Sequence, residues 1–189
     1  MDENLAAFLK VLDPSDNSTG GGTASAVAGA MAAALVGMVS RLSVGREGMA
    51  EDAFYEKITA EAEGLSKELF RGGWEDSEAF KAVMVGFKMP KETNEQRARR
   101  RKVIDAAMLE AALVPLANAE RCRRVLDLKK KLAGRFNPNA ASDLTCAEHL
   151  AKAGLLGCLA NVDINLGSIK DESRAAQIAE RAKAAGRLE

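Results

Sequence analysis

Apolar residues recur along most of the chain at the three- and four-residue spacing that is typical of amphipathic helices. No stretch alternates apolar and polar residues over the length of a strand. The pattern therefore predicts an all-α fold, a mostly antiparallel bundle of about seven to nine helices in one domain that spans residues 1–189. The expected helices cover residues 3–12, 20–42, 50–70, 76–88, 93–114, 116–132, 142–166 and 171–186.

Glycine and proline set the expected breaks between these helices. Gly72 and Gly73 are predicted to end one helix before Asp76, because glycine is unfavourable inside a helix. Pro115 is predicted to kink or restart another, because proline has no N–H to donate. Thr93 is predicted to cap a helix, with Gln96 as its capping-box partner. Asn139 or Ser142 is expected to cap the helix that follows the loop at residues 134–139.

The bundle is predicted to be organised around an Ala/Gly-rich segment. Gly20, Gly21 and Gly22 open it, and no charged residue lies between Asp16 and Arg41. Small side chains on all sides let neighbouring helices approach closely, which suits a central helix. A transmembrane helix is the alternative, because an uncharged run of this length could cross a bilayer. Alanine, glycine, serine and threonine dominate the run instead of the larger apolar residues that drive insertion, so no membrane partner is expected.

The three glycines also form a candidate binding loop. The first N–H groups of the helix that follows have no intrahelical partner, and the helix dipole favours an anion there. The loop lacks the lysine and the hydroxyl residue of a P-loop, and no strand precedes it, so neither nucleotide-binding fingerprint fits.

Composition argues against several classes of partner and cofactor. The 27 Lys and Arg residues balance the 27 Asp and Glu residues, so no nucleic-acid partner is expected. The three cysteines form no Cys-x-x-Cys pair and no cleavable signal is recognisable, which predicts a reduced, cytoplasmic protein. His149 is the only histidine, and no metal site is expected.

Three polar clusters are candidates for chemistry. Glu75, Asp76 and Glu78 place three carboxyl groups close together, and crowding would raise the pKa of one enough for acid and base work. Asp76 could equally be only a helix cap, because acids stabilise a helix N-terminus. The second cluster comprises Asn137, Asn139 and Asp143, and the third comprises Asn161 and Asn165. Each of these two clusters could serve either the fold or a polar ligand.

Eight short motifs occur in a shared order over most of the chain: Gly20-Gly21-Gly22-Thr23-Ala24, Ser43-Val44-Gly45-Arg46, Glu75-Asp76-Ser77-Glu78-Ala79-Phe80, Met89-Pro90-Lys91, Val114-Pro115-Leu116, Asn137-Pro138-Asn139-Ala140-Ala141-Ser142-Asp143-Leu144, Asn161-Val162 and Ile164-Asn165-Leu166. In this order they resemble the cyclodeaminase/cyclohydrolase family of folate enzymes. That family includes the C-terminal domain of formiminotransferase-cyclodeaminase and stand-alone bacterial methenyltetrahydrofolate cyclohydrolases. The chain departs from the family pattern at Thr19, where the family has proline.

The resemblance implies a helical homodimer that opens or closes the one-carbon bridge of tetrahydrofolate, without a metal or a redox cofactor. Asp76 falls on the family's catalytic aspartate and is the expected general acid and base. The resemblance and the polarity of Asn137, Asp143 and Asn165 suggest that these residues bind the pterin or support the site. The glycine loop Gly20, Gly21 and Gly22, together with Arg46 and Lys91, is expected to bind the glutamate tail of the folate substrate.

Two questions remain open at the level of sequence. Cyclohydrolase and cyclodeaminase activities share an intermediate, so the motifs do not separate them. A non-catalytic helical binding or scaffold protein of the same fold is the alternative function, although the intact Asp76 segment argues against it.

Overall fold

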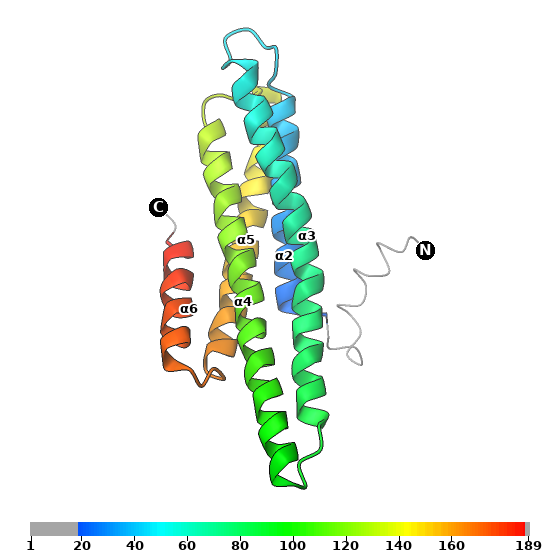
Figure 1. Ribbon diagram of the computed structural model, residues 1–189. Coiled ribbons are helices and arrows are strands. Elements are labelled where there is room, and N and C mark those ends of the chain that lie inside the picture. Colours follow the sequence, from blue (N-terminus) through cyan, green and yellow to red (C-terminus); the bar gives the residue numbers. More distant parts are fainter. Residues whose placement is uncertain (1–18, 188–189) are drawn as a thin grey trace, which may run out of the picture.

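The chain forms an elongated bundle of long helices (Figure 1). A computed structural model describes residues 19–187, and the predicted helix over residues 3–12 lies outside them. The described residues hold five α-helices and one short 3-10 helix, and no strand. The elements are α2 (Gly21–Arg41), α3 (Asp52–Lys88), α4 (Asn94–Leu132), η2 (Pro138–Ala140), α5 (Ala141–Leu166) and α6 (Glu172–Ala185).

The all-α prediction is confirmed, but the predicted count of seven to nine helices is wrong for the described residues, which contain five. Two expected breaks do not occur. Helix α3 continues through Gly72 and Gly73, and α4 continues through Pro115. In each case another helix packs against the residue that was expected to break the helix.

Gly72 and Gly73 are required by close packing. A Cβ on Gly72 would lie 2.0 Å from Oδ1 of the buried Asn118 side chain, which belongs to α4. A Cβ on Gly73 would meet the carbonyl oxygen of Thr23 on α2 at 3.4 Å. Glycine in a helix interior is unfavourable by about 1 kcal/mol relative to alanine. The two residues therefore weaken α3 locally and let two helices approach it.

Pro115 is accommodated by a side chain from α5. Because proline has no N–H, the carbonyl of Ala111 one turn earlier loses its intrahelical donor. The Nδ2 atom of Asn165 donates a hydrogen bond to that carbonyl at 2.7 Å. The bond satisfies a carbonyl that the proline would otherwise leave open, and it ties α5 to α4.

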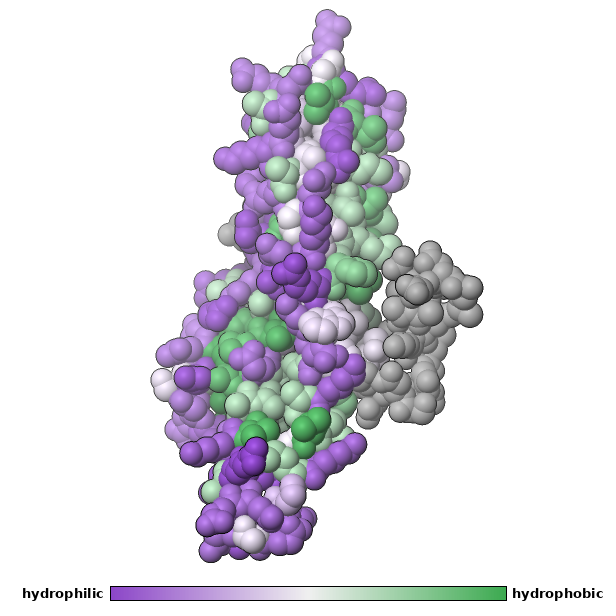
Figure 2. Space-filling view, turned by 45° about the vertical axis from the view of Figure 1, so that its right-hand side comes forward, coloured by the Kyte–Doolittle hydropathy of each residue, from purple (hydrophilic) through white to green (hydrophobic). Residues whose placement is uncertain are grey.

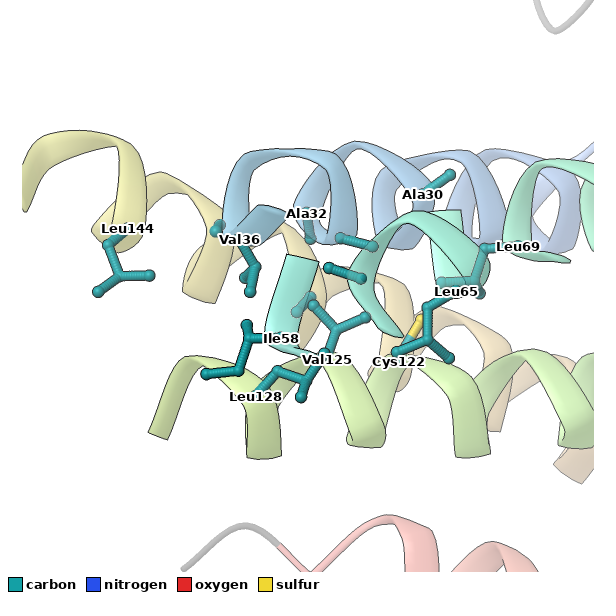
Figure 3. Packing of buried hydrophobic residues seen from close by; sticks show 14 of the residues in the cluster. Ala30, Ala32, Val36, Ile58, Leu65, Leu69, Cys122, Val125, Leu128 and Leu144 are labelled. Carbon is teal, nitrogen blue, oxygen red and sulfur yellow. The ribbon is translucent and has the colours of Figure 1, made fainter. Parts of the chain in front are cut away.

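The core lies between α2, α3, α4 and α5, and its leucine, valine and isoleucine side chains interdigitate in Figure 3. Helices α2 and α5 approach closely because small residues face each other. A Cβ on Gly157 would lie only 2.1 Å from the Oγ atom of Ser25, and one on Gly154 would lie 2.8 Å from the Ser25 carbonyl oxygen. The Ala/Gly-rich segment is therefore a packing helix, as predicted from its small side chains.

Helix α2 is nevertheless covered on only part of its circumference. Ala26, Ala32 and Val36 are fully buried, whereas Met31 and Met38 on the outward face are exposed. Within the described part of the chain, α2 is the one helix long and apolar enough to cross a membrane, and half of that stretch is buried in the bundle. Length and composition alone are weak evidence for a membrane span, because helices buried in a core also meet these criteria.

Local signals at the other helix ends gave mixed results. The capping box of Thr93 and Gln96 is present, as predicted. The predicted caps of α5 are wrong, because α5 begins at Ala141 without a side-chain cap and the turn of η2 precedes it. In that turn the Asn137 side chain accepts a hydrogen bond from the backbone N–H of Asn139.

Candidate functional site

Asp76 lies about two-thirds of the way along α3, beside the first turn of α2. The Thr23 hydroxyl donates a hydrogen bond to Oδ2 of Asp76 at 3.2 Å. A Cβ on Gly22 would lie 2.5 Å from Oδ1 of the same carboxyl group. The absence of a side chain at Gly22 therefore gives the carboxyl group its place against the α2 N-terminus.

The environment of Asp76 changes its acidity. Burial raises the pKa of this carboxyl group above its ordinary value, and it outweighs the hydroxyl and backbone hydrogen bonds from Thr23, which lower it. A raised pKa brings the group closer to holding a proton near neutral pH, which acid and base catalysis requires.

The physical cause differs from the one expected from sequence. Asp76 does not begin a helix, since α3 started at Asp52, and burial rather than neighbouring carboxylates raises its pKa. Glu78 instead pairs with Lys81 at 2.8 Å on the exposed side of α3. Asp76 does lie against a helix N-terminus, but the N-terminus belongs to α2.

The glycine loop is therefore used differently from a free anion site. Gly20 caps α2 without a side-chain hydrogen bond, and no acidic residue lies in the first turn of that helix. The backbone N–H of Thr23 in this turn lowers the pKa of the Asp76 carboxyl group, although burial has the larger effect. The Asp76 carboxyl group of α3 therefore lies against the first turn of α2, at the end of the helix where the dipole favours negative charge.

A buried amide lies behind this region that the sequence analysis did not single out. The Nδ2 atom of Asn118 donates to the Gly72 carbonyl at 3.1 Å, one turn before Asp76. Its Oδ1 atom accepts from Arg121 at 3.0 Å, and Arg121 also pairs with Glu68. The signals available in the sequence were a lone amide in an apolar helical segment and a Gly-Gly pair inside a helical pattern.

The two amides of α5 have separate roles. Asn161 borders the glycine loop, because a Cβ on Gly21 would meet its Nδ2 atom at 3.8 Å. Its Nδ2 atom donates to the Gly157 carbonyl within α5. Asn165 donates to the Ala111 carbonyl that Pro115 leaves open, so a structural contact accounts for this predicted site residue.

A second polar cluster lies at the opposite end of α2, where loops meet at the top of Figure 1. The Leu42 carbonyl accepts hydrogen bonds from Nε of Arg46 at 2.9 Å and from Nδ2 of Asn137 at 3.3 Å. The backbone N–H of Asn137 donates to the Ser43 hydroxyl at 2.9 Å. The half-buried Asp143 follows in the first turn of α5. We call these five residues, Leu42, Ser43, Arg46, Asn137 and Asp143, the Arg46 end.

The structure does not bring all the predicted site residues together in one chain. Helix α2 separates Gly22 from the Arg46 end by about 30 Å at 1.5 Å per residue. Lys91 lies in the other direction, past the C-terminal end of α3. Asp76 and Lys88, the last residue of α3, are about 18 Å apart along the helix, and Lys91 lies beyond Lys88. A single tail-binding group that includes the glycine loop, Arg46 and Lys91 is therefore wrong as a description of one chain.

A hollow on the surface of the bundle lies away from these residues. A cavity of about 370 Å³ between α5 and α6 is lined by apolar residues and by Asp163, Lys183 and Arg187. None of the predicted site residues lines it. The described residues also contain no group of three or more His, Cys, Asp or Glu side chains that could hold a metal ion.

The fold and the placement of the Asp76 motif define a class of protein. The model of the formiminotransferase-cyclodeaminase family matches residues 4–184, and the chain belongs to that family.

Among the relatives, the methenyltetrahydrofolate cyclohydrolase of Methylorubrum extorquens is 38% identical over 172 residues, which cover 90% of this chain and 83% of the relative. The formimidoyltransferase-cyclodeaminase of Rattus norvegicus is 30% identical over 91% of this chain, which spans only 32% of that longer protein. The crystal structure of formiminotetrahydrofolate cyclodeaminase from Thermotoga maritima superposes with a TM-score of 0.82 and 28% identity. The superposition covers 98% of this chain and 87% of the Thermotoga maritima chain.

Proposed function

We propose that this chain is a folate one-carbon enzyme, a methenyltetrahydrofolate cyclohydrolase, in which Asp76 is the general acid and base. In this reaction water attacks the methenyl carbon and the ring opens to the formyl compound. The observation that carries the proposal is the Asp76 carboxyl group, placed at the α2 N-terminus with a pKa that burial raises. The name and high coverage of the bacterial relative support cyclohydrolase as the first choice.

Each oxygen of Asp76 has a different surrounding. Oδ2 accepts from the Thr23 hydroxyl, which fixes the orientation of the carboxyl group. Oδ1 lies above Gly22, where no side chain intervenes. In the proposed mechanism one carboxyl oxygen removes a proton from the attacking water and then delivers it to the nitrogen that leaves the tetrahedral carbon.

Formimidoyltetrahydrofolate cyclodeaminase is the second candidate activity, favoured by the similarity to the Thermotoga maritima cyclodeaminase. There a folate nitrogen attacks the formimino carbon and ammonia leaves. The same acid and base would serve both reactions, because each passes through a tetrahedral carbon and moves one proton.

The proposal extends to the setting of the enzyme. The tetrahydrofolate derivative is the substrate, and no metal or redox cofactor is invoked. All three cysteines are free thiols and two of them are buried, which supports a reduced, cytoplasmic location. The active form is proposed to be a homodimer without a nucleic-acid or membrane partner.

A spectrophotometric assay tests the proposal. Purified protein is mixed with methenyltetrahydrofolate, and loss of the methenyl chromophore is followed above the uncatalysed rate. Asp76→Asn keeps the shape of the side chain but cannot carry the proton, so we expect turnover to fall by about 10²–10⁴-fold. Asp163→Asn, an exposed acid on α5, is the matched control and should keep near-normal turnover.

Two outcomes would contradict the proposal. Near-normal turnover of Asp76→Asn would remove Asp76 from the chemistry. A wild-type protein that neither consumes the methenyl compound nor releases ammonia from the formimino compound would leave the non-catalytic binding protein as the better description.

A further inference from the structure

We propose that Asn118 of α4 is a positioning residue for the folate reaction, because it hydrogen-bonds the turn of α3 that carries Asp76 and so fixes where the carboxyl group lies. This inference deepens the proposed function and rests on it for the role of Asp76 in catalysis. Three observations carry it: a fully buried amide, a backbone carbonyl that this amide shares with Asp76, and contacts that hold the same turn from two helices.

Asn118 is buried to a degree that is unusual for an amide side chain. Most polar side chains of a protein lie at its surface, as the hydrophilic residues that cover much of the bundle in Figure 2 do. Asn118 is fully buried, and Asn137 is the only other buried amide side chain among residues 19–187. Burying an amide is costly unless it forms hydrogen bonds, so the partners of Asn118 indicate what the residue does.

The partners of Asn118 fix which way its amide points. Oδ1 accepts a hydrogen bond from Nη1 of Arg121 at 3.0 Å, one turn later on α4. Arg121 also pairs with Glu68 of α3 at 3.0 Å. Because a guanidinium group can only donate, the amide oxygen faces Arg121 and the amide nitrogen faces away from it. On that side Nδ2 donates to the Gly72 carbonyl at 3.1 Å.

The Gly72 carbonyl connects this amide to Asp76. Helix α3 runs without a break from Asp52 to Lys88, and in an α-helix each N–H donates to the carbonyl four residues earlier. The backbone N–H of Asp76 therefore donates to the Gly72 carbonyl, which has two lone pairs and also accepts from Asn118. One oxygen atom thus holds the backbone of Asp76 and ties it to α4.

Glycine at position 72 lets the amide reach this carbonyl. The three atoms nearest to a Cβ on Gly72 would all belong to Asn118, at 2.0 Å for Oδ1, 2.7 Å for Cγ and 2.8 Å for Nδ2. Any side chain at this position would displace the amide. Glycine is unfavourable in a helix interior, and the close approach of Asn118 accounts for its presence here.

Helix α2 holds the same turn from another side. A Cβ on Gly73 would lie 3.4 Å from the Thr23 carbonyl oxygen, and the Thr23 hydroxyl donates to Oδ2 of Asp76 at 3.2 Å. Contacts from α4 and α2 together leave the carboxyl group little freedom to move. Catalytic groups must be held to within about 0.5 Å of their productive position, and Asn118 supplies the α4 half of that support.

Asn118→Leu tests the proposal directly. Leucine has a similar shape but forms no hydrogen bond, and the Gly72 carbonyl keeps its bond from the Asp76 N–H while Arg121 keeps Glu68. We expect kcat in the chromophore assay to fall by about 10-fold, because a small displacement of a reacting group slows the chemical step. KM should change by less than about twofold, because the fully buried Asn118 does not touch the substrate. Unchanged kcat would overturn the proposal.

Val125→Ala is the matched control for a general loss of packing. Val125 is fully buried two turns after Asn118 on the same face of α4, in the core that Figure 3 shows. The substitution leaves a cavity and lowers the free energy of unfolding, but kcat should stay near wild type at a temperature where both proteins are folded. An equal fall in kcat for Val125→Ala would attribute the loss to loosened packing and overturn the proposal.

The pH dependence of kcat/KM distinguishes positioning from a purely structural role. Its acid limb reports the pKa of the Asp76 carboxyl group in the free enzyme. Burial is the largest influence on that pKa and raises it, so a carboxyl group released from its place should titrate at lower pH. The acid limb should therefore move to lower pH in Asn118→Leu and stay in place in Val125→Ala. An unmoved limb in Asn118→Leu would contradict the positioning role.

A pair of alanine substitutions separates positioning from space filling. Gly72→Ala alone places its Cβ 2.0 Å from Oδ1 of Asn118 and should lower both stability and turnover. Adding Asn118→Ala removes the three nearest atoms, and alanine favours a helix more than glycine does, so the double variant should regain the lost free energy of unfolding. Its kcat should remain about 10-fold below wild type. Recovery of kcat together with stability would show that Asn118 only fills space.

A titration without substrate separates this inference from the proposed function. The carboxyl carbon of Asp76 is followed by NMR as pH changes, and its signal is identified by its loss in Asp76→Asn. Asn118→Leu should lower the midpoint of this titration. If wild-type protein turns over neither folate and the midpoint still moves, the proposed function fails and Asn118 positions the carboxyl group. If wild-type protein is active and neither the midpoint nor kcat changes, the proposed function stands and this inference fails.

Discussion

Each end of α2 carries a cluster of polar side chains, and the two clusters differ in how their polar groups are satisfied. At the N-terminal end the Thr23 hydroxyl donates a hydrogen bond to the Asp76 carboxyl group, and burial raises the pKa of that group. At the C-terminal end Ser43, Arg46 and Asn137 satisfy one another through the Leu42 carbonyl and the loop backbone. At the N-terminal end, burial therefore disfavours the charged form of the Asp76 carboxyl group. At the C-terminal end, the polar groups join two loops by hydrogen bonds.

This difference separates function from stability along one helix. A carboxyl group whose pKa is raised by burial is destabilising near neutral pH, and such groups are retained where chemistry needs them. The amide of Asn137 is buried with its donors and acceptors in use, as expected for a structural contact. Substitutions at the two ends should therefore change different measured quantities.

Among substitutions that leave Asp76 itself in place, the largest effect is expected from Gly22→Ala. The new Cβ would lie 2.5 Å from Oδ1 of Asp76, so the carboxyl group must move away from its present position. Misplacing a reacting group by about 1 Å lowers turnover by about 10²-fold, and we expect that loss with little change in the free energy of unfolding. Gly64→Ala is the control, because a Cβ there meets no atom within 4 Å. Equal turnover of the two variants in the chromophore assay would show that the Gly22 contact does not position Asp76.

A smaller effect, on stability, is expected from Asn137→Ala at the other end. The variant loses the bond to the Leu42 carbonyl and the acceptor for the Asn139 N–H inside a buried site. Unsatisfied buried groups of this kind lower the free energy of unfolding by about 1–3 kcal/mol. Urea unfolding followed by circular dichroism measures the loss. Asn139→Ala, an exposed amide in the same loop, should stay within about 0.5 kcal/mol of wild type. An Asn137→Ala variant with the same free energy of unfolding as wild type would contradict the structural role of Asn137.

Sequence patterns predicted the helices well where the deciding forces were local. The small-residue pattern gave α2 its bounds, and the Thr93 capping box gave α4 its start. The merging of the expected helices into α3 and α4 could not be predicted, because it depends on contacts between helices. Asn118 fills the space above Gly72, and Asn165 satisfies the carbonyl that Pro115 leaves open.

The candidate site divides in the same way. Asp76 and the glycine loop could be selected from sequence, and the structure places them side by side. Thr23 was not selected, because a threonine in the first turn of a helix carries no signal of its own until a carboxyl group faces it. The order of motifs also carries no distances, so Arg46 was grouped with residues that lie about 30 Å away along α2.

The smallest expected effect is a pH dependence that separates Asp76 from an ordinary carboxylate. Its pKa is raised in the folded protein, so between its unfolded value of 3.8 and its folded value the folded protein binds the proton more readily. The stabilisation from that proton is complete below the unfolded pKa and is lost as pH rises through the folded pKa. Asp76→Asn cannot titrate, so the stability of wild type relative to this variant should fall as pH rises from about 4 through the raised pKa of the folded protein.

Glu148 provides the opposite sign for comparison. Hydrogen bonds from Lys129 and Lys152 lower the pKa of its carboxyl group to about 2 from 4.5. The stabilisation is present above the unfolded value and is lost as pH falls toward the folded one, so wild type relative to Glu148→Gln should gain stability as pH rises from about 2 to 4.5. Urea unfolding from about pH 2 upward measures both differences. The stability of wild type relative to each variant should thus change with pH in opposite directions. A change in the same direction for both variants would mean that burial does not set the protonation of Asp76. The contrast between the two ends of α2 would then rest on geometry alone.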